Sequence, residues 1–443
     1  MSHVTFRYPD RQALDRELTD LGLALPLQGD LSPLSRPLTV AGRTLPNRIA
    51  IQPMEGCDGT FPGAPGELTR RRYRRFAASG AALIWGEATA VVPEGRANPR
   101  QLMLTRENLE EFKRMTEEIR QISLKENGFE PLLVMQATHS GRYAKPEGIP
   151  APLIAYNDPL FEGDRPIDES RILSDGYLAA LPEKFAAAVA LAAQAGFDGV
   201  DLKCCHRYLV SELLSAYTRR GKYGGSFENR TRLLRETVAA AQSVRPAGLF
   251  LTCRLNLYDG FPYPYGFGVR PEEGLTPDLT EAKAIARWLA TEGKMPLLNF
   301  TVGNPYVNPH VNRPYDRGGY IPPEHPLQGV ARMMDCVAGV KRAVPEVPVI
   351  GSGFSYLRHL APELAAGMVA AGGCDMAGFG REAFAYPDFA RDILARGGMD
   401  RRKCCLTCGK CTELMRAGST AGCAVRDPVY TEIYKRDVLK KED

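Results

Sequence analysis

The sequence predicts an α/β protein that folds as a (β/α)8 TIM barrel, with an N-terminal arm before the barrel and a cysteine-rich, cluster-binding tail after it. Short apolar segments alternate eight times with helical patterns, and eight parallel strands are what close such a barrel. Five of the eleven cysteines lie in the last forty residues, which sets the tail apart. An open doubly wound sheet is the alternative, but no GxGxxG motif follows an early strand.

We divide the chain into an arm at residues 1–36, a barrel at 37–398 and a tail at 399–443. One amphipathic helix is expected in the arm at 11–23, and the alternation around Ala41 and Gly42 predicts a β-hairpin that caps the bottom of the barrel. The expected barrel strands are 49–53, 82–86, 131–136, 199–203, 250–254, 297–301, 347–351 and 375–379. The expected helices between them are 68–79, 106–126, 182–195, 229–244, 278–291, 329–343 and 361–371.

The composition is that of an ordinary soluble globular protein, with 44% apolar and 24% charged residues. A net charge of +4 gives no case for binding nucleic acid or an anionic membrane. Charged residues interrupt the first dozen positions, so no signal peptide is expected, and the most apolar helical stretch, 185–197, is too short to span a bilayer. We therefore expect a cytoplasmic protein whose cysteines do not form disulfides.

The segment 196–208, GFDGVDLKCCHRY, contains the first candidate active-site residues. A strand that runs into a loop here would bring Lys203, His206 and Tyr208 to its carboxyl end, where a TIM barrel builds its active site. Lys203 and His206 could donate hydrogen bonds to a carbonyl oxygen that gains negative charge, and Tyr208 could deliver a proton nearby. The alternative is that the three are ordinary surface residues. Cys204 and Cys205, in the same loop, are expected to pack in the interior.

Small residues after the last two strands indicate a phosphate site. One strand ends at Gly351 and is followed by Ser352 and Gly353, and Gly380 with Arg381 follow the other. Loops after strands seven and eight of a TIM barrel often bind a phosphate, although glycines after a strand are also common in simple turns. Two long connections rich in aromatic residues and prolines, 258–274 and 304–326, are expected to wall a substrate pocket rather than to be surface insertions.

The tail contains the spacing Cys405-x2-Cys408-x2-Cys411-x11-Cys423. Three close thiolates and one distant thiolate can each bind one iron of a cubane, whereas structural zinc more often uses two separated CxxC pairs. The spacing therefore favours a [4Fe–4S] cluster, with zinc and no metal as the alternatives. Cys404 is one residue out of frame and is expected to be a bystander.

Seven further segments stand out along the chain: LPNRIAIQPM (45–54), GEATAVVPEGR (86–96), QATHSGR (136–142), AGFDGVDLKCCHRYL (195–209), KYGGSFENRTR (222–232), RLNLYDG (254–260) and GFGREAFAYPD (378–388). In these segments and in their order, the chain from about residue 37 to its C-terminus resembles the Old Yellow Enzyme family of FMN-dependent oxidoreductases. The barrel is most similar to the iron–sulfur branch of that family, which includes 2,4-dienoyl-CoA reductase and trimethylamine dehydrogenase.

The resemblance implies a role for each matched residue. Gln136 matches a residue that reads the flavin pyrimidine edge, Arg254 one near flavin N1, and Tyr208 the proton donor. The others implied to bind FMN are Pro53 and Met54 beside the isoalloxazine, and Gly353, Gly380 and Arg381 at the phosphate.

The sequence departs from the family at two positions. The usual His/His or His/Asn pair is Lys203 and His206 here, which favours an enolate or carboxylate substrate. The residue after Met54 is Glu55, whose charge would oppose a reduced flavin unless the carboxyl is neutral or turned away.

The resemblance implies an FMN-dependent oxidoreductase, and an ene-reductase is expected. Such an enzyme reduces an activated C=C bond of an enone, enoate or enoyl thioester, with hydride from flavin N5 and a proton from Tyr208. A flavin and iron–sulfur amine dehydrogenase or demethylase is the second interpretation, and a metal-stabilised barrel that binds a phosphorylated ligand is the non-redox one. NAD(P)H or a reduced partner protein is the expected electron donor, the partner being an electron-transfer protein or reductase. The resemblance also allows a homo-oligomer.

Overall fold

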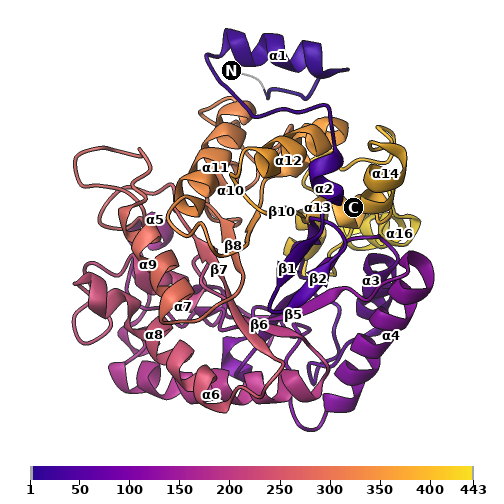
Figure 1. Cartoon of the computed structure of the whole chain (residues 1–443). Helices are drawn as coiled ribbons and strands as arrows, with labels where there is room; N and C mark the ends of the chain where they lie inside the picture. The colour runs from indigo at the N-terminus through magenta and orange to yellow at the C-terminus, as the bar shows by residue number, and fades with distance from the viewer. Residues whose placement is uncertain (1–2, 442–443) are drawn as a thin grey trace.

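The computed structural model describes residues 3–441 as a closed barrel of eight parallel strands surrounded by helices (Figure 1). The strands pair in the order β10-β3-β4-β5-β6-β7-β8-β9. They are β3 (Ile49–Ile51), β4 (Leu83–Ala90), β5 (Leu132–Thr138), β6 (Gly199–Leu202), β7 (Phe250–Asn256), β8 (Leu298–Thr301), β9 (Val349–Gly351) and β10 (Met376–Phe379). The predicted fold class and all eight strands are confirmed. Every residue of these strands is buried, as a parallel sheet covered by helices requires.

Helices fill the connections between the strands. The longer ones are α3 (Glu67–Ala77), α4 (Leu109–Asn127), α6 (Asp175–Gln194), α8 (Phe227–Val244), α9 (Thr280–Thr291), α11 (Pro326–Lys341), α12 (Ala361–Ala370) and α14 (Phe389–Arg396). The seven predicted helices are present, but α6 begins seven residues earlier than predicted, because Ser174 caps it by accepting a hydrogen bond from the Tyr177 N–H. Pro182 therefore lies inside α6 instead of starting it.

The early start also makes α6 longer than the apolar stretch in the sequence suggested. By length and composition α6 is the one helix in residues 3–441 that could cross a membrane. In this structure, however, one face of α6, which includes Phe185 and Val189, is buried in the core of the barrel, while Ala187 on the other face is exposed. The helix is thus accounted for as part of the barrel's outer layer.

The predicted hairpin is formed by β1 (Leu38–Val40) and β2 (Arg43–Leu45), which pair in antiparallel fashion. Ala41 and Gly42 at its turn both have positive φ, as a two-residue hairpin turn requires. Val40 and Leu45 pack against residues at the amino ends of the barrel strands, so the hairpin closes the bottom of the barrel. The arm contains α1 (Arg11–Asp20), which lies outside the ring of helices (Figure 1).

The cysteine-rich tail packs against the barrel instead of extending from it. It contains α15 (Lys410–Arg416) and α16 (Pro428–Asp437), and α16 lies near α3 and α14 in Figure 1. Arg71 and Arg75 of α3 both form ion pairs with Asp427 at the start of α16. The Ala421 N–H and the Thr420 hydroxyl each donate to the Gly56 carbonyl at 2.7 Å. These contacts hold the tail over the loop that follows β3, beside the mouth of the barrel.

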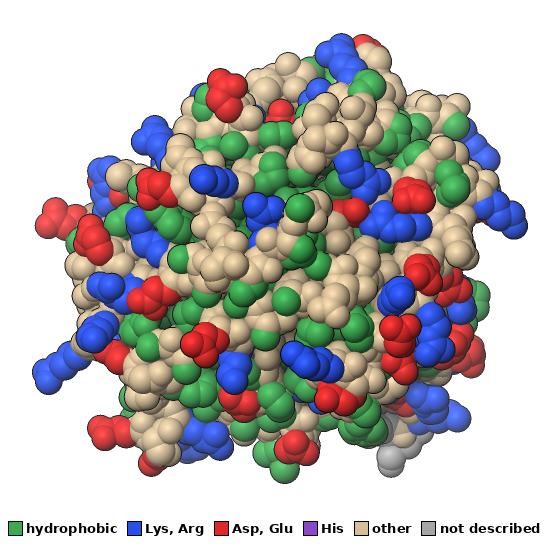
Figure 2. Space-filling view, turned by 60° about the horizontal axis from the view of Figure 1, so that its bottom comes forward, with side chains coloured by type: hydrophobic (Ala, Val, Ile, Leu, Met, Phe, Trp, Pro, Cys, Tyr) green, Lys and Arg blue, Asp and Glu red, His purple; other side chains and the backbone are tan. Residues whose placement is uncertain are grey.

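The shorter helices lie in the connections and the arm: α2 (Ser32–Ser35), α5 (Pro159–Glu162), α7 (Leu209–Leu214), α10 (Pro309–Asn312) and α13 (Arg381–Ala385). Basic and acidic side chains are interspersed on the face shown in Figure 2, and neither sign covers it. This mixture agrees with the small net charge of +4.

Candidate functional site

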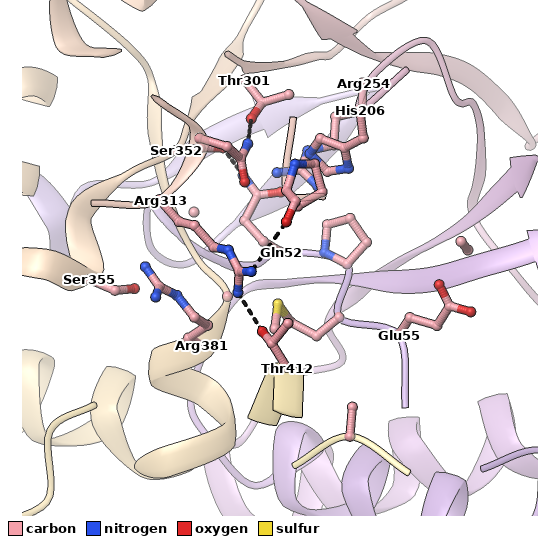
Figure 3. Close-up of a pocket in the computed structure, with 18 of the residues that line it drawn as sticks. Gln52, Glu55, His206, Arg254, Thr301, Arg313, Ser352, Ser355, Arg381 and Thr412 are labelled. Carbon is pink, nitrogen blue, oxygen red and sulfur yellow. Dashed lines mark hydrogen bonds between the residues drawn. The ribbon is translucent and has the colours of Figure 1, made fainter. Parts of the chain in front are cut away.

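One cavity of about 210 Å³ lies at the carboxyl ends of the barrel strands (Figure 3). All ten residues that the sequence analysis assigned to catalysis or to flavin binding line it, although they follow or end six different strands. They are Pro53, Met54, Gln136, Lys203, His206, Tyr208, Arg254, Gly353, Gly380 and Arg381. The structure thus brings these residues together, and their individual roles remain predictions.

Gln136 and Arg254 are oriented by Asp201, which is buried beneath the cavity. The Gln136 amide nitrogen donates to Asp201 Oδ2 at 2.6 Å, and the Arg254 backbone N–H donates to Asp201 Oδ1 at 2.7 Å. The Gln136 amide oxygen is therefore left as an acceptor, and Arg254 Nε has no hydrogen-bond partner within residues 3–441. An acceptor beside a guanidinium suits a ring that offers an N–H next to carbonyl oxygens, as the flavin pyrimidine edge does.

Two arginines, Arg313 and Arg381, face one end of the cavity, and neither has a carboxylate partner in the described part of the chain (Figure 3). Arg313 donates to Thr412 Oγ1 at 2.6 Å and to the Pro305 carbonyl at 3.2 Å. Burial, followed by the nearby charge of Arg381, lowers the pKa of Arg313 to about 10. Two neighbouring guanidinium groups that are only half-buried repel each other, and an anion between them would relieve that repulsion, so this end of the cavity suits a phosphate.

The backbone at this end depends on glycine. Gly353 has a φ of +107°, and a Cβ there would lie 2.6 Å from Met333 Cε. A Cβ on Gly380 would lie 2.8 Å from Met54 Sδ. The backbone conformation after β9 therefore favours glycine at position 353, whereas Gly380 has a φ of −100° and meets only the flexible side chain of Met54.

Lys203, His206 and Tyr208 line the cavity in the loop that follows β6. The Lys203 ammonium lies 3.4 Å from the centre of the Tyr208 ring, a cation–π contact. Burial is the main cause that lowers the pKa of Lys203 to about 8. Burial, with the charges of Arg254 and Lys203, lowers the pKa of His206 well below its usual value, so the imidazole is neutral at pH 7. His206 Nε2 is buried and finds no hydrogen-bond partner within residues 3–441.

The Tyr208 hydroxyl forms hydrogen bonds with two residues, Tyr306 and Glu55, that were not predicted to contact it. Its hydroxyl shares a 2.9 Å hydrogen bond with the Tyr306 hydroxyl and donates to Glu55 Oε2 at 3.4 Å. Glu55 also accepts from Asn98 Nδ2 at 2.8 Å. Burial raises the pKa of Glu55, although the charge of Lys203 opposes that rise. In Figure 3, Glu55 lies on the side of the cavity opposite to Arg313 and Arg381.

Burial also raises the pKa of Tyr208 well above its usual value, so its phenol keeps its proton at neutral pH. The site therefore combines a protonated phenol, a neutral imidazole and an ammonium around one open space. This set of donors can polarise a carbonyl group and protonate an adjacent carbon atom.

The four predicted cluster cysteines line a second, smaller cavity in the tail: Cys405, Cys408, Cys411 and Cys423. None of them forms a disulfide. The Thr407 N–H donates to Cys405 Sγ at 3.4 Å, and the Arg426 N–H donates to Cys423 Sγ at 3.3 Å. In residues 3–441 no group of three or more His, Cys, Asp or Glu side chains is arranged to hold a single metal ion. Four thiols that line one cavity, with N–H donors to two of the sulfur atoms, are the type of ligand that iron and zinc both accept.

Cys404, Cys204 and Cys205 line neither of the two cavities. Cys404 Sγ points to the Asp400 carbonyl at 3.4 Å and does not line the tail cavity. Cys204 and Cys205 are fully buried and do not line the main cavity. By contrast, Cys411 lines both cavities, so the two sites share a wall.

The sequence analysis missed Arg313, Tyr306 and the tail residue Thr412 as lining residues. Arg313 and Tyr306 lie in the connection 304–326, which was predicted only as a wall of the pocket. No motif surrounds Arg313, and it is 68 positions before Arg381. The single signal was the position of this connection after a predicted strand.

Comparisons with known proteins identify the family of this chain. The pattern of the NADH:flavin oxidoreductase / NADH oxidase family matches residues 33–261. The NADPH dehydrogenase of Bacillus subtilis (strain 168) is 31% identical over 268 residues, which are 59% of this chain and 70% of that protein. The NADPH dehydrogenase of Bacillus pumilus (strain SAFR-032) is 32% identical over 270 residues, with the same coverage.

Solved structures share the fold. A 2-naphthoyl-CoA reductase in complex with 2-naphthoyl-CoA matches with a TM-score of 0.73 and 19% identity, over 91% of this chain and 58% of that chain. Histamine dehydrogenase from Rhizobium sp. 4-9 matches with a TM-score of 0.68 and 20% identity, over 91% of this chain and 53% of that chain. The Old Yellow Enzyme homologue from Zymomonas mobilis matches with a TM-score of 0.61 and 21% identity, over 83% and 94%. This chain spans little more than half of the first two structures.

Proposed function

This chain belongs to the NADH:flavin oxidoreductase / NADH oxidase family and is an FMN-dependent oxidoreductase, and we propose that it is an ene-reductase for activated C=C bonds. The observation that carries the proposal is the convergence of Lys203, His206 and Tyr208 on the cavity that Gln136, Arg254 and Arg381 also line. NADPH is the donor named in the relatives, and NAD(P)H is the proposed source of electrons.

The residues of the cavity fit FMN. Gln136 and Arg254 would contact the pyrimidine edge, and Pro53 and Met54 the ring face. Gly353, Gly380 and Arg381, joined by Arg313, would hold the phosphate. When bound, FMN supplies the hydride that adds to the β-carbon of the alkene.

The chain's own residues would act on the other half of the reaction. Lys203 and His206 donate hydrogen bonds to the oxygen of the activating group, which gains negative charge as the hydride adds to the β-carbon. The O–H bond of Tyr208 then breaks, and its proton passes to the α-carbon. Solvent restores the proton to the phenolate. A substrate of this kind is a small unsaturated carbonyl or carboxyl compound.

The oxidative alternative, an amine dehydrogenase or demethylase, has support from the structural likeness to histamine dehydrogenase. An amine substrate would bring an ammonium to the aromatic side chains of the pocket. The Tyr208 ring already carries the Lys203 ammonium at 3.4 Å, so a second cation there would be repelled. This contact favours an uncharged or anionic substrate.

We also propose that Cys405, Cys408, Cys411 and Cys423 hold a [4Fe–4S] cluster, which when bound would carry single electrons. The wall that Cys411 shares with the main cavity supports electron exchange with FMN. An electron-transfer protein is then a second candidate donor, and a reducing compartment such as the cytoplasm suits the free cysteines. The division into arm, barrel and tail stays part of this proposal.

The function is tested by purifying the protein without oxygen and recording its absorption spectrum, then mixing the reduced protein with enones, enoates and amines. Flavin absorption and reoxidation by an enone or enoate support the ene-reductase. Reduction of the oxidised flavin by amines alone would favour the amine dehydrogenase. A protein that binds no flavin would favour the non-redox alternative, a metal-stabilised barrel that binds a phosphorylated ligand.

Arg313→Met and Arg381→Ala are each expected to weaken FMN binding by roughly 10- to 100-fold, because each removes a charge-assisted bond to phosphate worth about 1.5–3 kcal/mol. The measurement is the dissociation constant of FMN by fluorescence titration of the apoprotein. Arg317→Ala is the matched control, since Arg317 is an exposed cation in the same connection. If both variants bind FMN as tightly as the control does, the phosphate lies elsewhere.

Lys203 predicts a pH dependence. Its ammonium is a donor below a pKa of about 8 and is lost above it, so kcat/KM for an enone should fall as pH rises through about 8. Lys203→Met should remove that fall and cost about 3 kcal/mol in kcat/KM. Lys203→His should shift preference from carboxylated substrates to simple enones. An unchanged pH profile in Lys203→Met would show that another group titrates.

A further inference from the structure

Arg207 lies between two proposed catalytic residues, His206 and Tyr208, yet its side chain takes no part in lining the cavity. His206 and Arg207 both have left-handed backbone conformations, with φ of +65° and +56°. Two consecutive residues with a Cβ rarely adopt this conformation, so surrounding contacts must hold it. The turn sends His206 and Tyr208 to the cavity and Arg207 into the protein interior, where it is 0% exposed.

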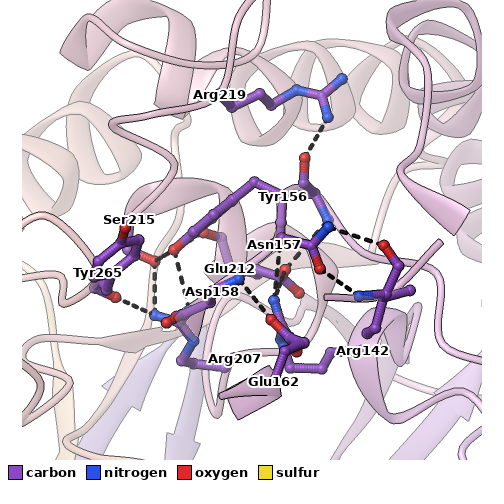
Figure 4. A network of polar contacts seen from close by, with 12 residues as sticks. Arg142, Tyr156, Asn157, Asp158, Glu162, Arg207, Glu212, Ser215, Arg219 and Tyr265 are labelled. Carbon is purple, nitrogen blue, oxygen red and sulfur yellow. Dashed lines mark hydrogen bonds and ion pairs between the residues drawn. The ribbon is translucent and has the colours of Figure 1, made fainter. Parts of the chain in front are cut away.

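The guanidinium of Arg207 connects three segments that surround the site (Figure 4). In the β5–α6 connection it donates to Tyr156 Oη at 3.1 Å and to Asp158. After α7 it donates to Ser215 Oγ at 2.8 Å. In the β7–α9 connection it donates to Asp259 Oδ2 at 3.2 Å and to the Tyr265 carbonyl at 2.6 Å. Three aromatic rings pack near the guanidinium, at 4.8 Å for Phe161, 5.6 Å for Phe261 and 6.0 Å for Tyr156. All of these partners are separate from the cavity residues.

The partners of Arg207 are themselves held in place. Asp259 accepts from Asn256 Nδ2 at 2.6 Å and from the Phe267 N–H at 3.0 Å. On the other side, Glu162 accepts from the Asp158 N–H and pairs with Arg142. Arg207 is therefore the point at which two long connections are joined to the loop that follows β6 (Figure 4).

We propose that Arg207 is a positioning residue that holds the left-handed turn and thereby aims the Tyr208 phenol and the His206 imidazole at the substrate. This inference rests on the proposed function, because it assumes that Tyr208 donates the proton. A glycine would adopt the same turn without strain, but it would leave the turn unanchored. A displacement of about 1 Å at a reacting group can cost about 10²-fold in rate. Loss of the Arg207 contacts should therefore slow the transfer of the proton from Tyr208.

The test compares Arg207→Gly and Arg207→Lys with Arg219→Gly. Arg219 is a matched control because it bonds to the Ala155 and Leu173 carbonyls of the same β5–α6 connection and makes no contact with the turn. Each enzyme is reduced with dithionite and mixed with 2-cyclohexen-1-one in H2O and in D2O, and its melting temperature is recorded.

Arg207→Gly is expected to react about 10- to 100-fold more slowly with the enone and to show a larger solvent isotope effect, because proton transfer becomes limiting. Arg207→Lys should recover part of the rate. Arg219→Gly should lower the melting temperature without changing the isotope effect. An Arg207→Gly enzyme with the isotope effect of the unmodified protein would overturn the positioning role, as would an Arg219→Gly enzyme with the same increase. If Arg207→Gly does not fold, Arg207→Lys with an unchanged rate and isotope effect overturns it as well.

Tyr208→Phe, measured in the same way, distinguishes a wrong proton donor from a wrong role for Arg207. If Tyr208→Phe reacts at the full rate, the proposed proton donor is wrong. If Tyr208→Phe is slow and Arg207→Gly is not, the donor stands and the inference about Arg207 fails.

Discussion

Tyr208→Phe is expected to slow the reaction of the reduced enzyme with an alkene by ~10²-fold or more, while reduction of the enzyme by NADPH stays nearly unchanged. The phenol keeps its proton at neutral pH, since burial raises its pKa well above the usual value. Stopped-flow absorbance of the flavin measures both half-reactions separately.

Tyr306→Phe is the control for this prediction, because its hydroxyl bonds to the Tyr208 hydroxyl at 2.9 Å. Its loss should slow the alkene reaction much less than the loss of Tyr208 does. If the two variants are equally slow, the proton reaches the substrate from the Tyr306 side. Equal slowing of both half-reactions in Tyr208→Phe would instead indicate a role in binding.

Replacing any of Cys405, Cys408, Cys411 or Cys423 with serine is expected to abolish the iron content of the purified protein, while Cys404→Ser keeps it. Each of the four would bind one iron, and Cys404 points to the Asp400 carbonyl instead. The measurement is iron and acid-labile sulfide per chain after anaerobic purification, with about four of each expected in the unmodified protein.

Zinc in place of iron would reject the cluster and retain the four cysteines as metal ligands. Loss of iron in Cys404→Ser together with its retention in Cys405→Ser would reject the ligand assignment itself. FMN content should be followed in the same samples, because Thr412 beside Cys411 bonds to Arg313 at 2.6 Å. Some loss of FMN in Cys411→Ser would show that the tail and the phosphate end depend on each other.

The amino-acid sequence determined the barrel, because its strands are short, nearly continuous apolar runs separated by helical periods. Each run is buried on both faces, so its pattern follows from local composition. The closure of eight such strands brings their carboxyl ends to one mouth, and for that reason residues as distant as Pro53 and Arg381 could be predicted to share a site. The cysteine spacing is likewise a local property of the chain.

Only the tertiary structure decided what the long connections contribute. Arg313 meets Arg381 because the connection after β8 folds back over the mouth, and Tyr306 meets Tyr208 for the same reason. The early start of α6 depends on a cap at Ser174 that apolar periodicity does not reveal. The left-handed turn at Arg207 is held by residues from three segments. Such contacts join residues that are far apart in the chain, and no local pattern encodes them, because their energy appears only once the barrel has brought the segments together.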